Sequence, residues 1–256
     1  MVKLEKYALQ GLVLIMNCLL VTSAAGEESH LFRLLEKVGQ SYESVRDYTA
    51  VFYKRERVDG EWRPEETVFL KFQKPFRVYL RWLTGPHGGR EALYVDGAHG
   101  NKVLIHEPDG ISRFFTFLLD PGGWRILQES RYPFTEIGIG PLIERIIQHA
   151  RRAWSKGELS LIDRGTGTIK GREVLEVEGI LPRDPRAGYS FYRAALSIDR
   201  ELGLPVRAAL YAWDNSLLGT YAYSDLRLNP GLGDEDFDSS NPSYNFPSWR
   251  ISLAEE

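Results

Sequence analysis

Residues 67–97 alternate apolar and polar side chains with a period of two. One apolar side carries Val68, Leu70 and Phe72 in the first segment and Val78, Leu80 and Trp82 in the second. Successive side chains of a strand point to opposite faces of a sheet, so this pattern predicts neighbouring antiparallel strands, each with one buried face. Such a sheet can curve around apolar contents, which favours a binding or carrier protein over an enzyme.

The remaining patterns predict a helix over residues 29–46, about six strands, a helical insertion and about five further strands. Within the insertion, residues 124–127 indicate a short helix and residues 140–154 a longer amphipathic one. Turn signals between the strands are short, which is typical of antiparallel hairpins. The fold class predicted is mainly β (α+β), with a single large curved antiparallel sheet and a few helices on its concave face.

The first 26 residues resemble a secretory signal peptide. Lys3 and Lys6 precede an apolar run over residues 11–21, and small residues follow at 22–26. This order predicts cleavage after residue 24, 25 or 26, leaving residues 27–256 as a single domain. A retained membrane anchor is disfavoured because the apolar run is short for a span. Lipid attachment at Cys18 is disfavoured because this residue lies inside the apolar run.

Composition narrows the classes of function. Cys18 is the only cysteine, so the mature chain would have neither a disulfide nor a thiol nucleophile. The formal net charge of −3 is small and both signs are interspersed, which argues against nucleic acid as a partner. About 230 residues are enough to bury a sizeable core without disulfides.

Several short motifs resemble the periplasmic lipoprotein carriers, LolA and its relatives. They are Lys74-Pro75-Phe76 followed by Trp82, residues 94–97 (Tyr-Val-Asp-Gly), residues 195–199, 204–207 and 223–229, and the tail motifs at 236–238 and 241–246. Together they span most of residues 30–246, and they look closest to an uncharacterised branch related to outer-membrane lipoprotein sorting.

The resemblance implies an open half-barrel of antiparallel strands, closed by helices around an apolar cavity that accepts acyl chains. It also implies a periplasmic location in a bacterium with two membranes. In the carriers an arginine directly before the proline helps to hold the lid closed, and here that position is Lys74. Lysine lacks the planar fork of donors that arginine has, so Lys74 is a gating candidate only.

The candidates for the wall of a lipid-binding cavity are the large apolar residues of the predicted strands and of the covering helix. They are Phe52, Val68, Leu70, Phe72, Val78, Leu80, Trp82, Leu93, Val95, Phe115, Phe117, Ile146, Ile147, Ala150 and Trp154. Burying an acyl chain yields about 0.8 kcal/mol per methylene, so few polar contacts are needed. Two alternatives stay open: the same residues can pack as a dry core, and the opposite assignment of sheet faces is possible.

No catalytic or metal-binding motif stands out. The five histidines lie in different predicted elements, and there is neither a nucleophile elbow nor a phosphate-binding loop. We therefore expect no enzyme activity, no cofactor and no metal, with a lipid or an acylated lipoprotein as the ligand. The alternative is a sensor or interaction module of the same fold that binds an envelope-stress signalling partner. An enzyme would require a cluster of titratable groups inside the cavity, such as two buried, facing carboxylates, and we expect the apolar faces to supply none.

Overall fold

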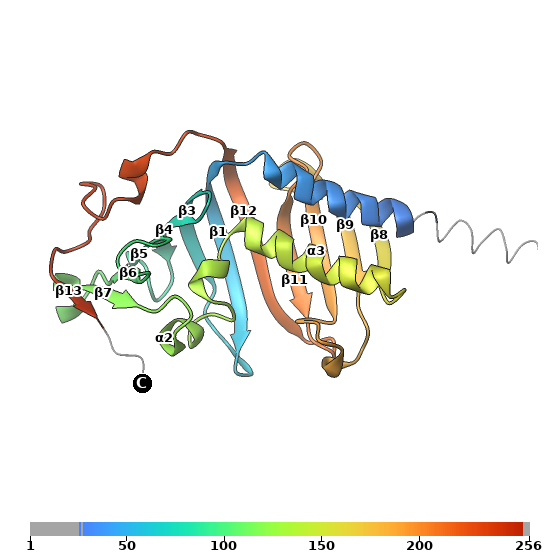
Figure 1. Ribbon diagram of the computed structural model, residues 1–256, viewed down its shortest axis with the longest axis horizontal. Coiled ribbons are helices and arrows are strands. Elements are labelled where there is room, and N and C mark those ends of the chain that lie inside the picture. Colours follow the sequence, from blue (N-terminus) through green and yellow to red (C-terminus); the bar gives the residue numbers. More distant parts are fainter. Residues whose placement is uncertain (1–25, 27, 253–256) are drawn as a thin grey trace, which may run out of the picture.

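The computed structural model describes residues 26 and 28–252, and the account below concerns these residues. A curved sheet of thirteen strands runs through the molecule (Figure 1). Twelve strands follow the order β13-β7-β6-β5-β4-β3-β1-β12-β11-β10-β9-β8, and β2 pairs with β1 outside this path. All pairings are antiparallel except that of β13 with β7. The predicted fold class, a large open antiparallel sheet with a few helices, is confirmed.

The first half of the sheet comprises β1 (Asp47–Val58), β2 (Glu61–Trp62), β3 (Glu66–Gln73), β4 (Arg77–Thr84), β5 (Glu91–Val95), β6 (Val103–His106) and β7 (Thr116–Leu119). The second half comprises β8 (Ser160–Ile169), β9 (Arg172–Ile180), β10 (Arg193–Asp199), β11 (Pro205–Tyr211) and β12 (Leu217–Leu228). The short β13 (Arg250–Ser252) pairs with β7 and so lies at the edge of the first half. The helices are an N-terminal helix over residues 28–43, α2 (Trp124–Leu127) and α3 (Ile139–Ser155). Four short 3-10 helices are also present: η1 (Ile111–Phe114), η2 (Phe134–Glu136), η3 (Pro185–Ala187) and η4 (Asp234–Phe237).

Strand β1 joins the two halves, because it pairs with β3 on one side and with β12 on the other. Opposite Phe52 lie Val68 on β3 and Tyr223 on β12. Directly opposed residues of antiparallel strands point to the same face, so these three side chains share one face. We call this the inner face; it also carries Leu70 and Leu80.

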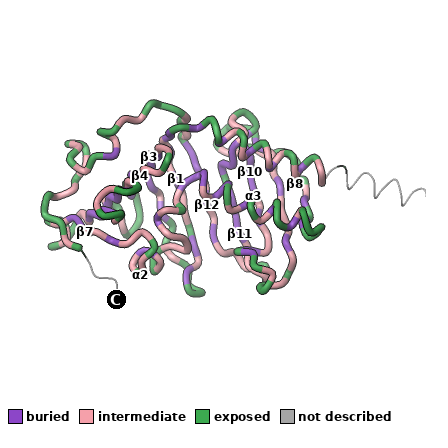
Figure 2. The backbone as a smooth tube through the Cα atoms, in the orientation of Figure 1, coloured by how far each residue is buried: buried purple, intermediate pink, exposed green. Residues whose placement is uncertain are grey.

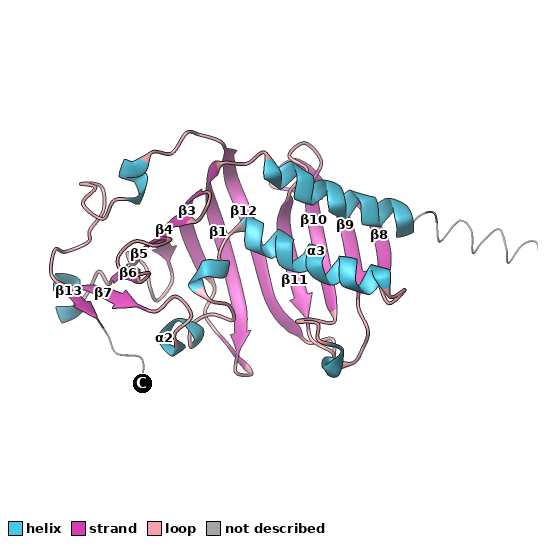
Figure 3. Cartoon of the chain, viewed as in Figure 1, coloured by secondary structure: helices cyan, strands magenta, loops and turns pink. Residues whose placement is uncertain are grey.

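The N-terminal helix and α3 lie side by side across the inner face (Figure 3). Seven of the eight buried residues of α3 are apolar side chains or alanines that repeat at helical spacing: Ile139, Leu142, Ile143, Ile146, Ile147, Ala150 and Ala153. The predicted amphipathic helix of the insertion is therefore confirmed. Buried residues concentrate on the strands beneath these two helices (Figure 2). The inner face and the helices thus form the main core.

The start of α3 is fixed by close contact with the sheet. The backbone N–H of Ile139 donates a hydrogen bond to the hydroxyl of the fully buried Tyr48, at 2.9 Å. A Cβ at Gly140 would come within 2.4 Å of the Tyr42 hydroxyl, and Gly138 has a φ of 109°. Only glycine tolerates the close approach at position 140 and the positive φ at position 138 at low cost. We call α2, α3 and the segment between them (residues 124–155) the cover. At the start of α3 the cover is therefore anchored to β1 and to the N-terminal helix.

Part of the outer face of the sheet, on β3, β4 and β5, is covered by the C-terminal tail. Tyr244 stacks on Tyr79 with ring centroids 3.9 Å apart, and Lys71 pairs with Asp236 at 2.6 Å. Phe237, which is 5% exposed, packs in a second apolar cluster with Leu93. The tail motifs singled out in the sequence therefore cover part of the face that the helices leave open.

Two sequence predictions need correction or lie outside the structure. One of the six strands that the sequence predicts before the insertion covers residues 112–117, but in the structure η1 occupies Ile111–Phe114 and β7 starts at Thr116. The turn forms because Gly110 adopts a φ of 66° and the Ser112 hydroxyl donates to the Asp109 carbonyl. The predicted signal peptide lies outside the described residues except for Gly26. Within the described part of the chain, none of the helices combines the length and apolarity that crossing a membrane requires.

Phe237→Ala should lower the free energy of unfolding by about 3 kcal/mol, because it opens a cavity under the tail. Urea denaturation of the two proteins measures this loss. Phe114→Ala is the matched control, since Phe114 is 53% exposed, and it should cost no more than about 0.5 kcal/mol. Equal losses in the two variants would show that the tail does not pack on the outer face.

Candidate binding cavity under the helical cover

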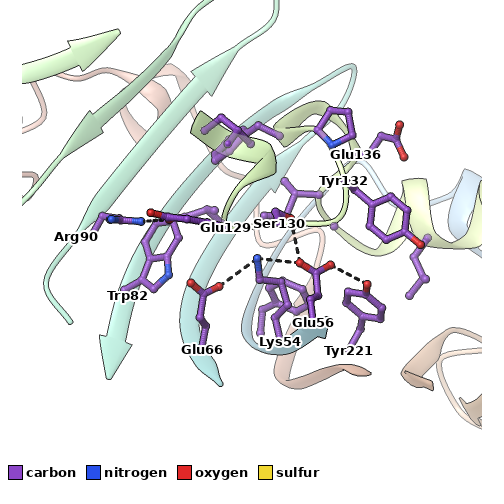
Figure 4. A pocket seen from close by; sticks show the side chains of 18 of the residues that line it. Lys54, Glu56, Glu66, Trp82, Arg90, Glu129, Ser130, Tyr132, Glu136 and Tyr221 are labelled. Atoms are coloured by element: carbon purple, nitrogen blue, oxygen red, sulfur yellow. Dashed lines mark hydrogen bonds and ion pairs between the residues drawn. The ribbon is translucent and has the colours of Figure 1, made fainter. Parts of the chain in front are cut away.

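A cavity of about 80 Å³ lies between the inner face and the helical insertion (Figure 4). Strands β1, β3, β4 and β12 provide its floor, and residues 126–145 of the insertion provide its roof. The apolar part of its lining includes Phe52, Leu80 and Tyr223 from the sheet and Ile137 and Leu142 from the cover. Phe52 stacks on Tyr223 with centroids 4.9 Å apart. This part of the cavity is apolar, as the sequence predicts for the inner face.

The other part of the cavity is charged. The Lys54 ammonium lies 3.3 Å from a carboxylate oxygen of Glu56 and 3.1 Å from one of Glu66. Glu56 is almost fully buried and accepts further hydrogen bonds from the Tyr221 hydroxyl at 2.7 Å and the Ser130 hydroxyl at 3.1 Å (Figure 4). Two buried carboxylates therefore share one cation on the inner face.

Sequence reasoning missed this charged group, although a signal was present. Lys54 and Glu56 follow Phe52 in steps of two along β1, and Glu66 precedes Val68 in the same way along β3. Side chains two residues apart share a face, so the alternation that predicted the apolar wall also places these three charges on it. The expectation that the inner face supplies no titratable groups is wrong.

The pKa values of Lys54 and Glu56 are both shifted so that each side chain keeps its charge. Burial alone would lower the pKa of Lys54, but Glu56 and Glu66 raise it above its ordinary value. Burial would raise the pKa of Glu56, yet Lys54 and the hydrogen bond from Tyr221 lower it on balance. A general acid or base works best when its pKa lies near the working pH. These shifts move both pKa values away from neutrality, so the geometry suits binding better than proton transfer.

A second ion pair separates this cavity from a neighbouring one. Arg90 pairs with Glu129 at 2.5 Å and with Glu107 at 2.7 Å. Arg90, Glu129, Ile105 and Ile126 line both the first cavity and an adjoining space of about 270 Å³. The Arg90–Glu129 pair is therefore part of the partition between the two spaces.

On its other side the cavity borders an open groove of about 770 Å³. Tyr132, Glu136 and Arg145 line both spaces. The Arg145 guanidinium lies 3.4 Å from the centroid of the Tyr132 ring and forms an ion pair with Glu136. These three side chains of the insertion form the wall between the groove and the cavity.

The structure places the predicted cavity residues in four locations. Phe52, Leu80 and Trp82 line the cavity. Val68, Leu70, Phe72 and Val78 lie on the same inner face and pack in the main core, together with Ile146, Ile147 and Ala150 of α3 and, at its margin, Trp154. Leu93 and Val95 lie in the outer-face cluster. Phe117 lines the neighbouring 270 Å³ space, and Phe115 lies beside Trp249.

Lys74, the gating candidate, lies at the end of the N-terminal helix. Its ammonium donates to the carbonyls of Tyr42 at 2.8 Å and Glu43 at 3.3 Å, and it lies 4.3 Å from the centroid of the Tyr42 ring. A cation at the last carbonyls of a helix is stabilising. Tyr42 also lies against Gly140 of α3, so Tyr42 is the only residue between Lys74 and α3 in this chain of contacts. Its role in gating stays a prediction.

Metal ligands do not gather anywhere in the described residues, where no group of three or more His, Cys, Asp or Glu side chains could hold an ion. The acidic tail residues are engaged otherwise: Asp236 pairs with Lys71, and Asp234 pairs with Arg77.

Comparisons with known proteins place the chain in a family. Residues 45–246 match the family described as proteins of unknown function, DUF1571, and the chain belongs to this family. No curated protein matches the sequence.

Among solved structures, the lipoprotein LppX of Mycobacterium tuberculosis matches with 12% identity and a TM-score of 0.50, over 82% of this chain and 100% of that one. MucB of Pseudomonas aeruginosa in its complex with MucA matches with 15% identity and a TM-score of 0.46, over 81% and 60%. A LolA superfamily protein of Nitrosomonas europaea matches with 12% identity and a TM-score of 0.33, over 80% and 96%. The similarity to LppX concerns the fold alone, and it agrees with the open antiparallel sheet and helices that the sequence resemblance implies.

Lys54→Met should destabilise the protein by about 3–5 kcal/mol, because it leaves two buried carboxylates without their cation. Urea denaturation at pH 7 measures the change. Arg55→Met is the control on the same strand, where Arg55 is exposed, and it should cost less than about 1 kcal/mol. A similar small loss in both variants would contradict the importance of the buried pair.

Stability should fall as the pH drops below the ordinary glutamate pKa of 4.5. The pKa values of Glu56 and Glu129 are lower in the folded protein, so the unfolded chain binds more protons in this range. The stabilisation is present above pH 4.5 and is lost as the pH approaches the folded pKa values. Urea denaturation between pH 7 and pH 3 should show a shallower fall for Glu56→Gln than for the exposed control Glu61→Gln. Identical slopes would contradict the assignment.

Proposed function

We propose that this protein is a non-enzymatic binding protein of the bacterial envelope that holds the acyl chain of a lipid or of an acylated lipoprotein. The observation that carries the proposal is the gradient along β1 and β3. The inner face is apolar at Phe52 and Val68 and becomes charged at Lys54, Glu56 and Glu66, with a cavity at the boundary. An amphiphile has the same two-part character.

The cavity must expand to accept an acyl chain. Its volume of about 80 Å³ is below the roughly 300–1,000 Å³ of typical ligand pockets. The cover would therefore have to move away from the inner face. Each methylene buried there contributes about 0.8 kcal/mol, so a long chain can offset the loss of contacts between cover and sheet.

The polar contacts of α3 with its surroundings are weak enough to allow such movement, whereas its apolar contacts with the inner face would have to be replaced by contacts with the ligand. On α3, Arg151 pairs with Glu36 of the N-terminal helix, and Arg152 donates to the carbonyls of Ala187 and Gly188. Exposed ion pairs of this kind contribute about 0–1 kcal/mol each. The route that we infer runs from the open groove past Tyr132 and Arg145 into the cavity. Loading and release then follow a shift between closed and open states.

The proposal includes export. Residues 1–26 would act as a cleaved signal peptide, so that residues 27–256 work in the periplasm as one lipid-binding domain. Lys74 would influence the cover through the end of the N-terminal helix. Outer-membrane sorting of lipoproteins is the role in which such a carrier would hand its ligand to an acceptor.

A second candidate function is an interaction module that binds an envelope protein, such as a stress-signalling partner. One observation favours it: Ile111, Phe114 and Trp249 are 80%, 53% and 69% exposed, in the neighbourhood of β7 and β13. Exposed apolar groups of this kind mark many interaction sites. A stable complex recovered from envelope extracts, unchanged by Leu80→Ala, would favour this function.

The lipid-binding proposal can be tested through Trp82, which lines the cavity. A monoacylglycerol brominated along its acyl chain quenches tryptophan only on contact. We expect quenching that saturates with the brominated lipid and is competed by the unbrominated one. Most of the quenched fluorescence should disappear in Trp82→Phe and persist in Trp124→Phe, where Trp124 lies at the surface. Unsaturable quenching, or quenching that is the same in both variants, would contradict acyl binding under the cover.

A further inference from the structure

Apart from Glu66, whose carboxylate pairs with Lys54, three residues that line the cavity carry a buried polar group with no hydrogen-bond partner among the described residues. These groups are the indole N–H of Trp82, the Nε–H of Arg90 and the hydroxyl of Tyr132. Trp82 and Arg90 are 8% and 9% exposed, so bulk water does not readily satisfy them. Buried polar groups in native proteins almost always have a partner. Three exceptions along one small cavity indicate that a ligand or ordered water supplies the partner.

The chemistry of the missing partner follows from the donors. An indole nitrogen and a guanidinium Nε can only donate. The remaining arms of Arg90 are occupied by Glu129 and Glu107, so its Nε–H is the donor left over. The partner must therefore offer an oxygen acceptor, and a pure hydrocarbon does not fit.

The charge of the lining excludes an anionic acceptor. Four carboxylates line the cavity, namely Glu56, Glu66, Glu129 and Glu136, against the three cations Lys54, Arg90 and Arg145. Each cation already contacts a carboxylate. A phosphate would have no free cation and would be repelled by the surplus carboxylate at short range. An uncharged oxygen avoids this cost.

The size of the cavity agrees with a small group. One water needs about 10–15 Å³ of such volume, so about 80 Å³ holds roughly five to eight water-sized groups. That is comparable with an ester together with the glycerol carbons and hydroxyls beside it. The apolar side chains of Phe52 and Leu80 border the same space and would meet the start of the chain.

We propose that the cavity binds the uncharged, oxygen-bearing part of an acylglycerol, with Trp82 and Arg90 donating hydrogen bonds to its ester or hydroxyl oxygens. This inference rests on the proposed acyl binding and adds selectivity for neutral over phosphorylated head groups. Tyr132 closes the site on the side of the groove and can donate to the same group or accept from it.

The test compares two lipids that share one acyl chain, monooleoylglycerol and oleoyl lysophosphatidic acid, by calorimetric titration of the purified protein. We expect monooleoylglycerol to bind at least tenfold more tightly. Trp82→Phe keeps an aromatic ring but removes the N–H, and it should weaken monooleoylglycerol binding about tenfold. Trp62→Phe, a matched change at a partly exposed position outside the cavity, should leave the affinity unchanged.

A second readout does not depend on the variant's affinity. The indole N–H proton resonance of Trp82, assigned by its absence in Trp82→Phe, should shift when monooleoylglycerol is added. Equal affinity for the two lipids, or tighter binding of the phosphorylated one, would overturn the head-group inference and leave acyl binding intact. A failure of both lipids to bind would overturn acyl binding as well and would leave a cavity filled by water only.

Discussion

The pairing of β1 with both β3 and β12 is the constraint on which the rest of the structure depends. This strand presents four residues with three functions on one face, at even spacings along the chain. Tyr48 fixes the start of α3, Phe52 lines the cavity, and Lys54 and Glu56 form the charged group. Because side chains two residues apart share a face, the anchor of the cover and the two ends of the cavity have a fixed spacing. A shift of one residue in the register would move all of them to the outer face.

The charged group is costly for a core. Desolvating two carboxylates and an ammonium is unfavourable, and apolar replacements of buried ion pairs are often neutral or stabilising. Here the cost is partly offset, since Glu56 accepts hydrogen bonds from Tyr221 and Ser130 in addition to its ion pair. Ser130 belongs to the insertion, so the network also joins the sheet to the cover. Together with the unpartnered N–H groups of Trp82 and Arg90, this arrangement keeps one end of an otherwise apolar cavity polar.

Much of the fold follows from local patterns in the sequence. The alternation at Val68, Leu70 and Phe72 predicts their shared face, and the helical repeat through Ile146 and Ala150 predicts which side of α3 is buried. These features depend on neighbours along the chain. The site is harder to predict because it depends on contacts between distant residues. Arg90 meets Glu129 across 39 positions, and Glu56 meets Tyr221 across 165.

Which face a short strand turns to the core is equally hard to predict from the sequence. Leu93 and Val95 alternate as an inner-face pair would, but the pairing of Leu80 with Ala92 turns them to the outer face. There they meet a tail whose contacts are far away in the sequence. The charged group at Lys54 is different, because Lys54 and Glu56 follow Phe52 in steps of two along β1 and their shared face can be predicted from the sequence. A search for apolar residues alone does not reveal this group.

The central claim is that an amphiphile occupies the space between the inner face and the cover. Native mass spectrometry of the protein purified without detergent tests it most directly. We expect a protein that carries an excess mass, which extracts into organic solvent and is a neutral acylated lipid. A mass equal to that of the chain alone, unchanged after incubation with phospholipid or monooleoylglycerol, would contradict it.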